Sequence, residues 1–199
     1  MGALVTGDAC VAMFGTLYEM GRLHLPHGAH VLEVGCAEDD WLTPMTLERP
    51  DLHLTGIDWR DCERPGTVIR GDVLTHDFPA ESFDAIVGIS SFEHIGLGHY
   101  SQDPLDEDGD RHCFERIVKW LKPWGWVYGD VPYDPDRYSV NGTAYRTYDD
   151  AAIASRLIVP GLVETDRWYC SLDEPRHLTK ECPPSIASMR IVMVVAEKA

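Results

Sequence analysis

The segment that most constrains the fold is residues 30–40, HVLEVGCAEDD. Its first half is rich in valine and leucine, as in a buried strand, and Gly35 allows a tight turn directly after it. The acidic residues 38–40 suit the first turn of a helix. A strand, a tight turn and a helix in this order predict an open α/β sheet, in which nucleotide-like ligands bind beyond the carboxyl end of such a strand.

The charge of this turn separates two kinds of ligand. A dinucleotide site needs the pattern G-x-G-x-x-G and places a pyrophosphate on the helix N-terminus, but Ala37 and Asp40 replace the second and third glycines. Glu33 and the acidic turn instead favour a positively charged ligand end, such as the ammonium and sulfonium of S-adenosylmethionine. The alternative is that residues 38–40 only complement the helix dipole.

Three further segments end in polar residues that suit an adenosine ligand. HLTGID predicts a second strand ending at Asp58, where a carboxylate would meet the ribose hydroxyls, and Trp59 then either stacks on the adenine or packs in the core. TVIRGDV predicts a third strand ending at Asp72, which with the Val73 amide reads the adenine edge or, alternatively, caps a turn. FDAIVGISSFEH predicts a buried fourth strand ending near Ser90.

These motifs, in this order, resemble those of the class I S-adenosylmethionine-dependent methyltransferases, specifically type 11-like members. The resemblance covers roughly residues 30–148, and within it EHIGLGHY, DPLDEDGD and LKPWGW are similar to a little-characterised bacterial group. It departs from the family pattern at the glycine loop, where only Gly35 of three alternating glycines remains and Ala37 and Asp39 occupy the other positions. The matching segments are Glu33-Val34-Gly35-Cys36-Ala37, Gly56-Ile57-Asp58, Gly71-Asp72-Val73, Phe83-Asp84-Ala85-Ile86-Val87 and Leu121-Lys122-Pro123-Trp124-Gly125.

The resemblance implies a fold and a cofactor. The expected fold is α/β and Rossmann-like, a doubly wound seven-stranded sheet, mostly parallel with one antiparallel strand, in a single domain over residues 1–199. The expected cofactor is S-adenosyl-L-methionine. The residues expected to hold it are Glu33, Gly35, Cys36, Ala37, Asp58, Trp59, Asp72, Val73 and Ser90.

Candidate catalytic residues follow the fourth strand, where the cofactor and a methyl acceptor should meet. Glu93 and His94 lie there, and His94 suits a general base because the unperturbed pKa of histidine is about 6.5. Its alternative role is to orient Glu93 or to brace the loop. Tyr133 and Arg137, after the fifth predicted strand, are expected to line the acceptor pocket. Arg146 would hold an acidic group of the substrate or cap a loop.

An acidic loop at residues 101–110 is the one candidate for a divalent metal. Asp106, Asp108 and Asp110 follow the spacing of a calcium loop only in part, because Pro104 stands where the essential first acid should be. Helix capping and solvation therefore rank above metal binding, and no metal site is assigned.

The remaining segments complete the expected sheet. Apolar spacing predicts helices and strands, and the last two strands form a hairpin that closes the sheet. The expected helices are 8–25, 41–47, 112–121 and 148–157, and the expected later strands are 85–89, 126–131, 162–170 and 189–197.

Composition excludes several partners. A net charge of −16 over 199 residues disfavours binding to nucleic acid or to an anionic membrane surface. The sequence has neither a secretory leader nor about 18 consecutive apolar residues, so a cytoplasmic protein is expected. Its six cysteines include no C-x-x-C pair, which indicates reduced thiols. Aromatic residues such as Trp124 would suit a homodimer.

The sequence therefore predicts a methyltransferase that acts on a small polar acceptor, with O-methylation of a sugar or metabolite as the expected reaction. Two alternatives stay open. One is a methyltransferase-like scaffold that has lost catalysis, for which Asp39 in the glycine loop is the best support. The other is an enzyme on the same fold that transfers a different group from the adenosyl sulfonium.

Overall fold

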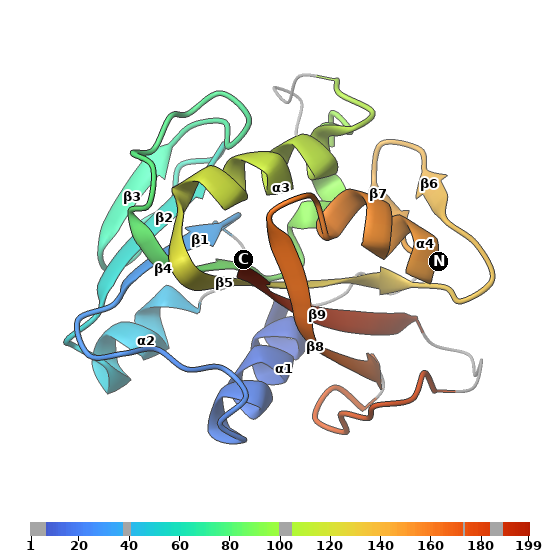
Figure 1. The fold of residues 1–199 in the computed structure, drawn as a ribbon, viewed down its shortest axis with the longest axis horizontal. Coiled ribbons are helices and arrows are strands. Elements are labelled where there is room, and N and C mark those ends of the chain that lie inside the picture. The colour runs from blue at the N-terminus through green and yellow to red at the C-terminus, as the bar shows by residue number, and fades with distance from the viewer. Residues whose placement is uncertain (1–6, 38–40, 100–104, 173, 184–188) are drawn as a thin grey trace.

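A seven-stranded sheet runs through the middle of the molecule, with helices on both of its faces (Figure 1). The computed structural model describes residues 7–37, 41–99, 105–172, 174–183 and 189–199. The strands of this sheet are β1 (His30–Val34), β2 (His53–Asp58), β3 (Thr67–Arg70), β4 (Phe83–Gly88), β5 (Leu121–Tyr133), β8 (Leu162–Ser171) and β9 (Arg190–Lys198). The helices are α1 (Gly7–Glu19), α2 (Leu42–Glu48), η1 (Phe92–His94), α3 (Gly109–Trp120), α4 (Asp150–Ala152) and η2 (Ile153–Leu157).

The strand order is β3-β2-β1-β4-β5-β9-β8. The neighbours β3, β2, β1, β4 and β5 are parallel, whereas β9 runs antiparallel to both β5 and β8. The expected Rossmann-like sheet, mostly parallel with one antiparallel strand, is therefore confirmed. Because the strands from β3 to β5 share one direction, the turns after β1, β2, β4 and β5 lie along one edge of the sheet.

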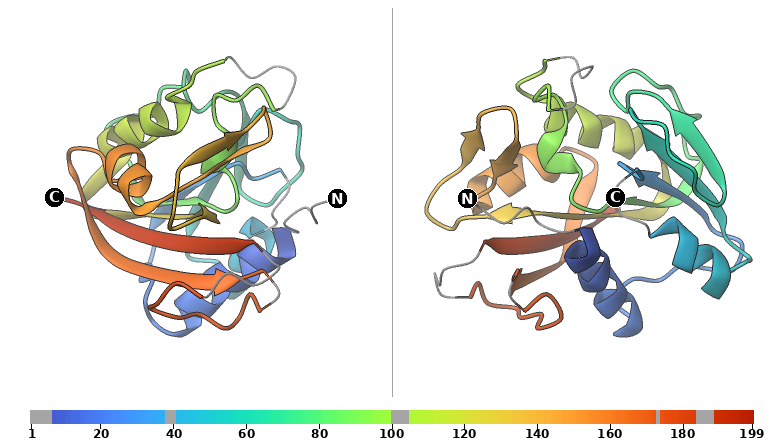
Figure 2. Two further views of the ribbon diagram at one scale, coloured as in Figure 1. Left: turned by 90° about the vertical axis from the view of Figure 1, so that its right-hand side faces the viewer. Right: turned by 180° about the vertical axis from the view of Figure 1, so that it is seen from behind.

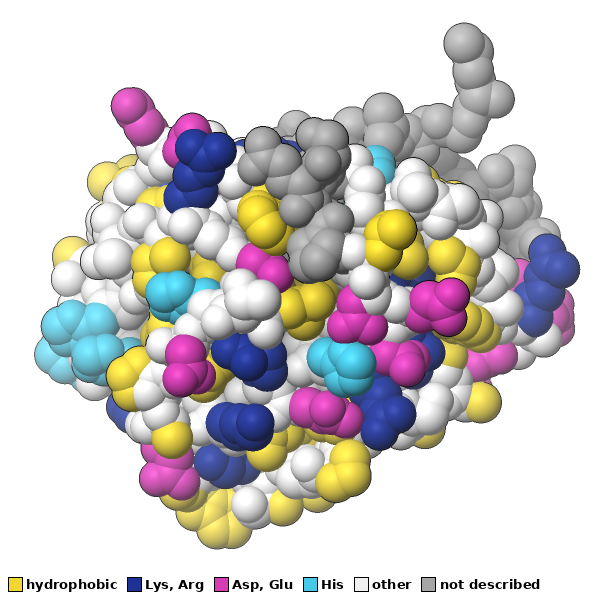
Figure 3. Space-filling model, turned by 90° about the horizontal axis from the view of Figure 1, so that it is seen from above, with side chains coloured by type: hydrophobic (Ala, Val, Ile, Leu, Met, Phe, Trp, Pro, Cys, Tyr) yellow, Lys and Arg dark blue, Asp and Glu magenta, His cyan; other side chains and the backbone are white. Residues whose placement is uncertain are grey.

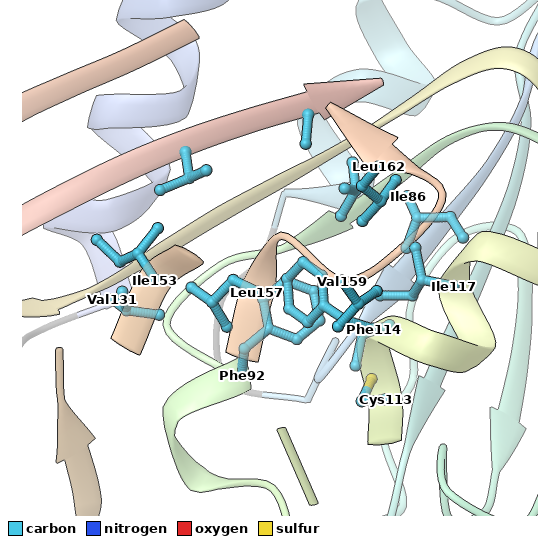
Figure 4. Close-up of a cluster of buried hydrophobic side chains, with 14 of the residues drawn as sticks. Ile86, Phe92, Cys113, Phe114, Ile117, Val131, Ile153, Leu157, Val159 and Leu162 are labelled. Carbon is cyan, nitrogen blue, oxygen red and sulfur yellow. The ribbon is translucent and has the colours of Figure 1, made fainter. Parts of the chain in front are cut away.

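Successive side chains of each strand point to opposite faces of the sheet and pack into two separate hydrophobic cores. On one face, Leu32 of β1 and Ile86 of β4 pack with Phe92, Phe114 and Ile117, as Figure 4 shows for the last four of these. On the other face, Val31 belongs to a second cluster, which is formed with α1 and α2. Figure 2 shows α1 and α2 on one side of the sheet and α3 on the other. The sheet is thus buried on both faces, as expected for long apolar strands.

Three ends of elements differ from the sequence prediction. Helix α1 ends at Glu19 instead of residue 25, because Gly21 adopts a left-handed conformation (φ 68°) and the amide of Arg22 bonds back to the carbonyl of Leu17. Strand β3 ends at Arg70 and leaves Asp72 in the following loop. Strand β5 begins at Leu121 instead of residue 126, so the turn expected before residue 126 is part of the strand. The register of β5 against β4 shifts between Phe83 and Ala85.

A small hairpin was not expected from the sequence. Strands β6 (Ser139–Asn141) and β7 (Tyr145–Thr147) pair antiparallel to each other beside the main sheet. Gly142, at φ 60°, makes the turn between them. The last two long strands do pair antiparallel as predicted, but β9 enters the sheet between β5 and β8. In the described part of the chain, no helix is both long enough and apolar enough to cross a membrane.

Candidate cofactor and acceptor site

The turn after β1 can be made only by glycine. Gly35 has φ 84°, and a Cβ atom placed on it would lie 2.1 Å from Oγ of Ser91. The amide of Gly35 also donates to the carbonyl of Ile57 in the neighbouring strand (2.9 Å). The turns after β1 and β4 are therefore in direct contact, which is the arrangement expected of a cofactor cradle. The acidic residues 38–40 lie outside the described part of the chain.

Asp58, at the end of β2, is held by the protein itself. Its Oδ2 accepts the amide of Ala37 (3.0 Å), and its Oδ1 accepts the amide of Arg60 (2.9 Å). The guanidinium of Arg60 adds two bonds, from Nε to Oδ1 (3.0 Å) and from Nη2 to Oδ2 (3.1 Å). Four donors occupy the two oxygens, so ribose hydroxyls could bind this carboxylate only by displacing the guanidinium. The Arg60 side chain is 29% exposed, so water lies close enough to receive it.

A second arginine also contacts the turn. Nε of Arg64 donates to the carbonyl of Cys36 (3.4 Å), and Nη2 donates to the carbonyl of Ala37 (3.2 Å). Sequence reasoning missed both Arg60 and Arg64. The available signal was weak, because it consists only of two arginines shortly after the predicted ribose acid.

The other residues expected at the adenosine end are placed as follows. Glu33 is buried within β1, and Val73 is also buried. Trp59 is half-buried directly after Asp58. Asp72 is buried and accepts the amide of Leu74 at its Oδ1 (2.8 Å), which is the contact of a turn cap. The hydrogen bond of Asp72 is therefore the one expected if this residue caps a turn. Asp72 follows the end of β3 by two residues.

Two buried carboxylates lie at the ends of β4 and β5. Ser90, in a left-handed conformation at φ 47°, donates its amide to Oδ1 of Asp130 (2.9 Å) and its hydroxyl to Oε1 of Glu93 (3.2 Å). Burial raises the pKa of Asp130 to about 7, and the charge of Glu93 adds to this effect. Asp130 was not among the residues expected at the site. The one feature of the sequence that could have indicated it is its position near the end of a predicted strand.

His94 lies between a carboxylate and a backbone carbonyl. Its Nε2 is 3.7 Å from Oε1 of Glu93, and its Nδ1 contacts the carbonyl of Ala144 between β6 and β7. Its ring also stacks on that of His99, with 5.0 Å between centroids. If Nδ1 carries the proton, Nε2 is left as the basic atom and Glu93 stabilises the imidazolium that forms when it takes a proton. The same contacts brace the β6–β7 loop.

The three residues expected to bind the substrate differ in their surroundings. Tyr133 is buried, and its hydroxyl donates to Oδ1 of Asp150 at the start of α4 (3.0 Å). Arg137 is exposed in the loop after β5. Arg146 is fully buried and donates from Nη1 to the carbonyl of Ile95 (2.7 Å). Its contacts are those of a loop cap, which was the second of its two expected roles.

Three acids of the 101–110 loop, Asp106, Asp108 and Asp110, contact basic side chains of the protein. Oδ2 of Asp106 is 2.7 Å from Nδ1 of His112, and this bond raises the pKa of His112. Asp108 pairs with Arg156 (3.1 Å), and the buried Asp110 pairs with both Arg156 (2.6 Å) and Arg146 (3.6 Å). Figure 3 shows acidic and basic side chains interspersed on this side of the molecule. Among the described residues, no three His, Cys, Asp or Glu side chains gather as metal ligands.

Comparison with known families places the chain. Residues 72–178, more than half of it, match the model of a family described as Caenorhabditis protein of unknown function, DUF268. This chain belongs to the DUF268 family. The matched part of this DUF268 protein contains the Ser90–Glu93–His94 turn, Asp130 and Arg146, whereas the Gly35 turn and Asp58 precede it. No protein with a curated description matches the chain.

Solved structures resemble the DUF268 protein in fold. A 1,6-didemethyltoxoflavin-N1-methyltransferase of Burkholderia thailandensis, solved with S-adenosylhomocysteine, is 18% identical over 96% of this chain and 78% of that one (TM-score 0.66). The N-methyltransferase NodS of Bradyrhizobium japonicum, also with S-adenosylhomocysteine, is 16% identical over 96% and 86% (TM-score 0.58). The [4+2]-cyclase SpnF is 16% identical over 94% and 81% (TM-score 0.65). The fold is therefore that of the class I S-adenosylmethionine-dependent methyltransferases.

Proposed function

We propose that this DUF268 protein is an S-adenosylmethionine-dependent methyltransferase that acts on a small polar acceptor, with an oxygen of a sugar or metabolite as the methylated atom. The observation that carries the proposal is the contact between three turns at one sheet edge. Gly35 has no room for a side chain against Ser91, and Asp58 is bonded to the amide of Ala37 in the same turn. A glycine turn facing an acid at the next strand end suits adenosine binding.

Different residues of the cradle are assigned to the ribose, the adenine and the methionine part of the cofactor. Asp58 would bind the ribose hydroxyls after Arg60 swings into water, and Trp59, Asp72 and Val73 lie toward the adenine. Glu33, Gly35, Cys36, Ala37 and Ser90 form the methionine side. When bound, S-adenosylmethionine supplies an electrophilic methyl group on its sulfonium. The protein contributes alignment, because methyl transfer is an in-line displacement and positioning lowers its barrier.

His94 is assigned the acceptor proton. With Nδ1 held at the carbonyl of Ala144, Nε2 is the atom that takes the proton, and the carboxylate of Glu93 stabilises the resulting positive charge. We assign Arg137, which is exposed after β5, and Tyr133, which is buried at the end of β5, to the acceptor site. We assign all of residues 1–199 to one cytoplasmic domain, and the exposed Trp124 stays the candidate contact of a homodimer.

Calorimetric titration of the reduced protein tests the cofactor. S-adenosylmethionine and S-adenosylhomocysteine should bind with micromolar affinity, and NAD, as the control, should not bind. Absence of heat with both adenosyl compounds would reject the proposed function, because the cradle would then not hold the cofactor.

His94→Gln tests the base once an acceptor is found by screening sugars and hydroxylated metabolites for methylated products. Turnover should fall while affinity for S-adenosylhomocysteine stays normal, because His94 acts on the acceptor and not on the cofactor. His99→Gln is the matched control, since this exposed ring stacks on His94. Equal turnover of wild type and His94→Gln would remove His94 from that role.

The engagement of Asp58 by Arg60 favours a second candidate function, a cofactor-binding scaffold without catalysis. In that case S-adenosylmethionine would bind saturably and no acceptor would yield a product. A third outcome is a product of another mass, which would indicate transfer of a different group from the sulfonium. Mass spectrometry of the reaction mixture distinguishes the three.

A further inference from the structure

Two cysteine thiols face each other across the cradle. Cys36 follows Gly35 in the turn after β1, and Cys62 lies in the segment after β2, beyond Asp58 and Arg60. Their Sγ atoms are 3.6 Å apart. A disulfide has an S–S distance of about 2.05 Å, so an approach of about 1.5 Å would join the two segments. The sequence gives no motif for this pair, because the two residues lie far apart along the chain.

The surroundings give the two thiols different chemistry. Cys36 is fully buried, and its Sγ lies where a Cβ on Gly56 would be only 2.6 Å away, so the glycine of β2 makes room for it. Burial, together with the neighbouring Cys62, raises the pKa of the Cys36 thiol. Cys62 is half-buried and therefore open to solvent on one side. An oxidant in solution consequently meets Cys62 first.

We propose that Cys36 and Cys62 are a reversible thiol–disulfide pair, and that the disulfide fastens the turn after β1 to the segment after β2. Hydrogen peroxide is the oxidant. The Cys62 thiol releases its proton to solvent, and the thiolate attacks one oxygen of the peroxide. The O–O bond breaks, Cys62 becomes a sulfenic acid, and the departing hydroxide takes up a proton from solvent and leaves as water. Sγ of Cys36 then attacks the Cys62 sulfur. The S–O bond breaks, and the departing hydroxide takes the Cys36 proton and leaves as a second water. A dithiol reverses the change by thiol–disulfide exchange.

Other cysteines lie against different groups. Sγ of the buried Cys170 is 3.5 Å from Sδ of Met13, and Cys182 lies 3.8 Å from Nη1 of Arg190. In these two contacts the partner of the thiol is a thioether and a guanidinium, respectively. Cys182 is half-buried, as Cys62 is, and therefore serves as the matched control for accessibility.

The crosslink would change the cradle, and this part of the inference rests on the proposed function. Arg60 lies between Asp58 and Cys62 in the segment that the disulfide tethers. Since cofactor ribose must displace the Arg60 guanidinium from Asp58, a tethered segment makes the displacement harder. Oxidation is therefore expected to weaken cofactor binding. By linkage, bound cofactor then disfavours the disulfide by the same factor.

Mass spectrometry of the full chain tests the pair directly. Reduced protein is treated with one equivalent of hydrogen peroxide, the remaining thiols are alkylated, and the protein is digested. The expected result is a linked Cys36–Cys62 peptide as the main oxidised species, which dithiothreitol converts back. Cys36→Ser and Cys62→Ser should both lack it, whereas Cys182→Ser should keep it. A main product with another disulfide, or with oxidised but unlinked Cys62, would overturn the proposal.

Calorimetry then tests the coupling to the cofactor. S-adenosylhomocysteine should bind the oxidised protein at least about fivefold more weakly than the reduced protein. Cys62→Ser, checked for normal thermal unfolding and replaced by Cys62→Ala if it unfolds early, should bind equally before and after peroxide. Equal affinities of the two wild-type forms would overturn the coupling. Absence of binding to the reduced form would instead reject the proposed function, while the mapped crosslink decides the thiol pair independently.

Discussion

Asp58 and Asp110 are two carboxylates with similar partners and different surroundings. Both are nearly inaccessible to solvent and both are paired with guanidinium groups. Asp110 lies with Arg146, whose side chain is also fully buried, and its Oδ2 further accepts the hydroxyl of Tyr148 (2.7 Å). The partner of Asp58 is Arg60, of which 29% is exposed. One guanidinium is enclosed by protein, and the other lies at the surface.

This difference decides what each pair can do. Removing one partner of an enclosed pair leaves a charge without compensation in a medium of low dielectric constant, which costs several kcal/mol. A partly exposed guanidinium can move into water, so its attraction to the carboxylate is worth little net free energy. The same two functional groups therefore form a permanent anchor at Asp110 and an exchangeable contact at Asp58.

The largest effect is expected at the enclosed pair. Asp110→Asn leaves Arg146 and Arg156 without their shared negative partner, so the free energy of unfolding should fall by about 3 to 5 kcal/mol. Urea denaturation measures it. Asp108→Asn is the control, since this half-exposed acid pairs with Arg156 from the surface and should cost at most about 1 kcal/mol. Equal losses in the two variants would contradict the comparison.

Asp130 extends the comparison to a buried carboxylate that accepts a backbone amide, that of Ser90, and faces the charge of Glu93 and the thiol of Cys10. Its pKa of about 7 lies above the unfolded value, so the native state holds the proton longer. Stability should therefore fall as pH rises from about 4 toward 7, by at most about 1.4 kcal/mol per pH unit. The free energy of unfolding, measured by denaturation across this pH range, should depend on pH with a different slope in wild type and in Asp130→Asn. Parallel curves would contradict the raised pKa.

Asp58→Ala tests the exchangeable carboxylate through the cofactor. Each charge-assisted hydrogen bond to a ribose hydroxyl is worth about 1.5 to 3 kcal/mol, so affinity for S-adenosylhomocysteine should fall at least about tenfold. The exposed neighbour Asp61, which pairs with Arg70, supplies the control variant Asp61→Ala, whose affinity should be unchanged. Full affinity in Asp58→Ala would place the ribose elsewhere.

The smallest effect is expected at Arg60. Because its guanidinium competes with ribose for Asp58, Arg60→Gln should bind S-adenosylhomocysteine more tightly, by up to about fivefold, which is the worth of an exposed ion pair. Arg70→Gln, which removes an exposed arginine bonded to Asp61, should not change the affinity. Weaker binding by Arg60→Gln would make Arg60 part of the cofactor site and not its competitor.

The central strands could be predicted because their signal is local. The segment HLTGID predicted β2 with its exact bounds, and the valine- and leucine-rich run before Gly35 predicted β1. The ends of these strands pointed to Gly35 and Asp58. The β6–β7 hairpin escaped prediction because three-residue strands show no periodicity. The end of α1 was placed too late because the apolar pattern continues past Gly21, where only the backbone conformation stops the helix.

The contacts that distinguish the site were beyond the sequence for a different reason. Whether Arg60 folds back on Asp58, or Arg146 turns toward Asp110 instead of solvent, depends on how distant segments pack. The same holds for the approach of Cys36 to Cys62 and for the burial that raises the pKa of Asp130. Sequence position predicted which edge of the sheet these residues occupy, but not their partners.

The position of β9 has a consequence for how the chain is made. Strand β8 leaves the ribosome before β9, yet its only place in the sheet is beside β9, which separates it from β5. The strands from β1 to β5 can assemble while synthesis continues, whereas β8 has no edge to join until residues 190–198 have emerged. Co-translational folding should therefore proceed in two stages. A fragment ending before β9 should keep β8 unprotected in hydrogen exchange until a peptide carrying the missing strand is added.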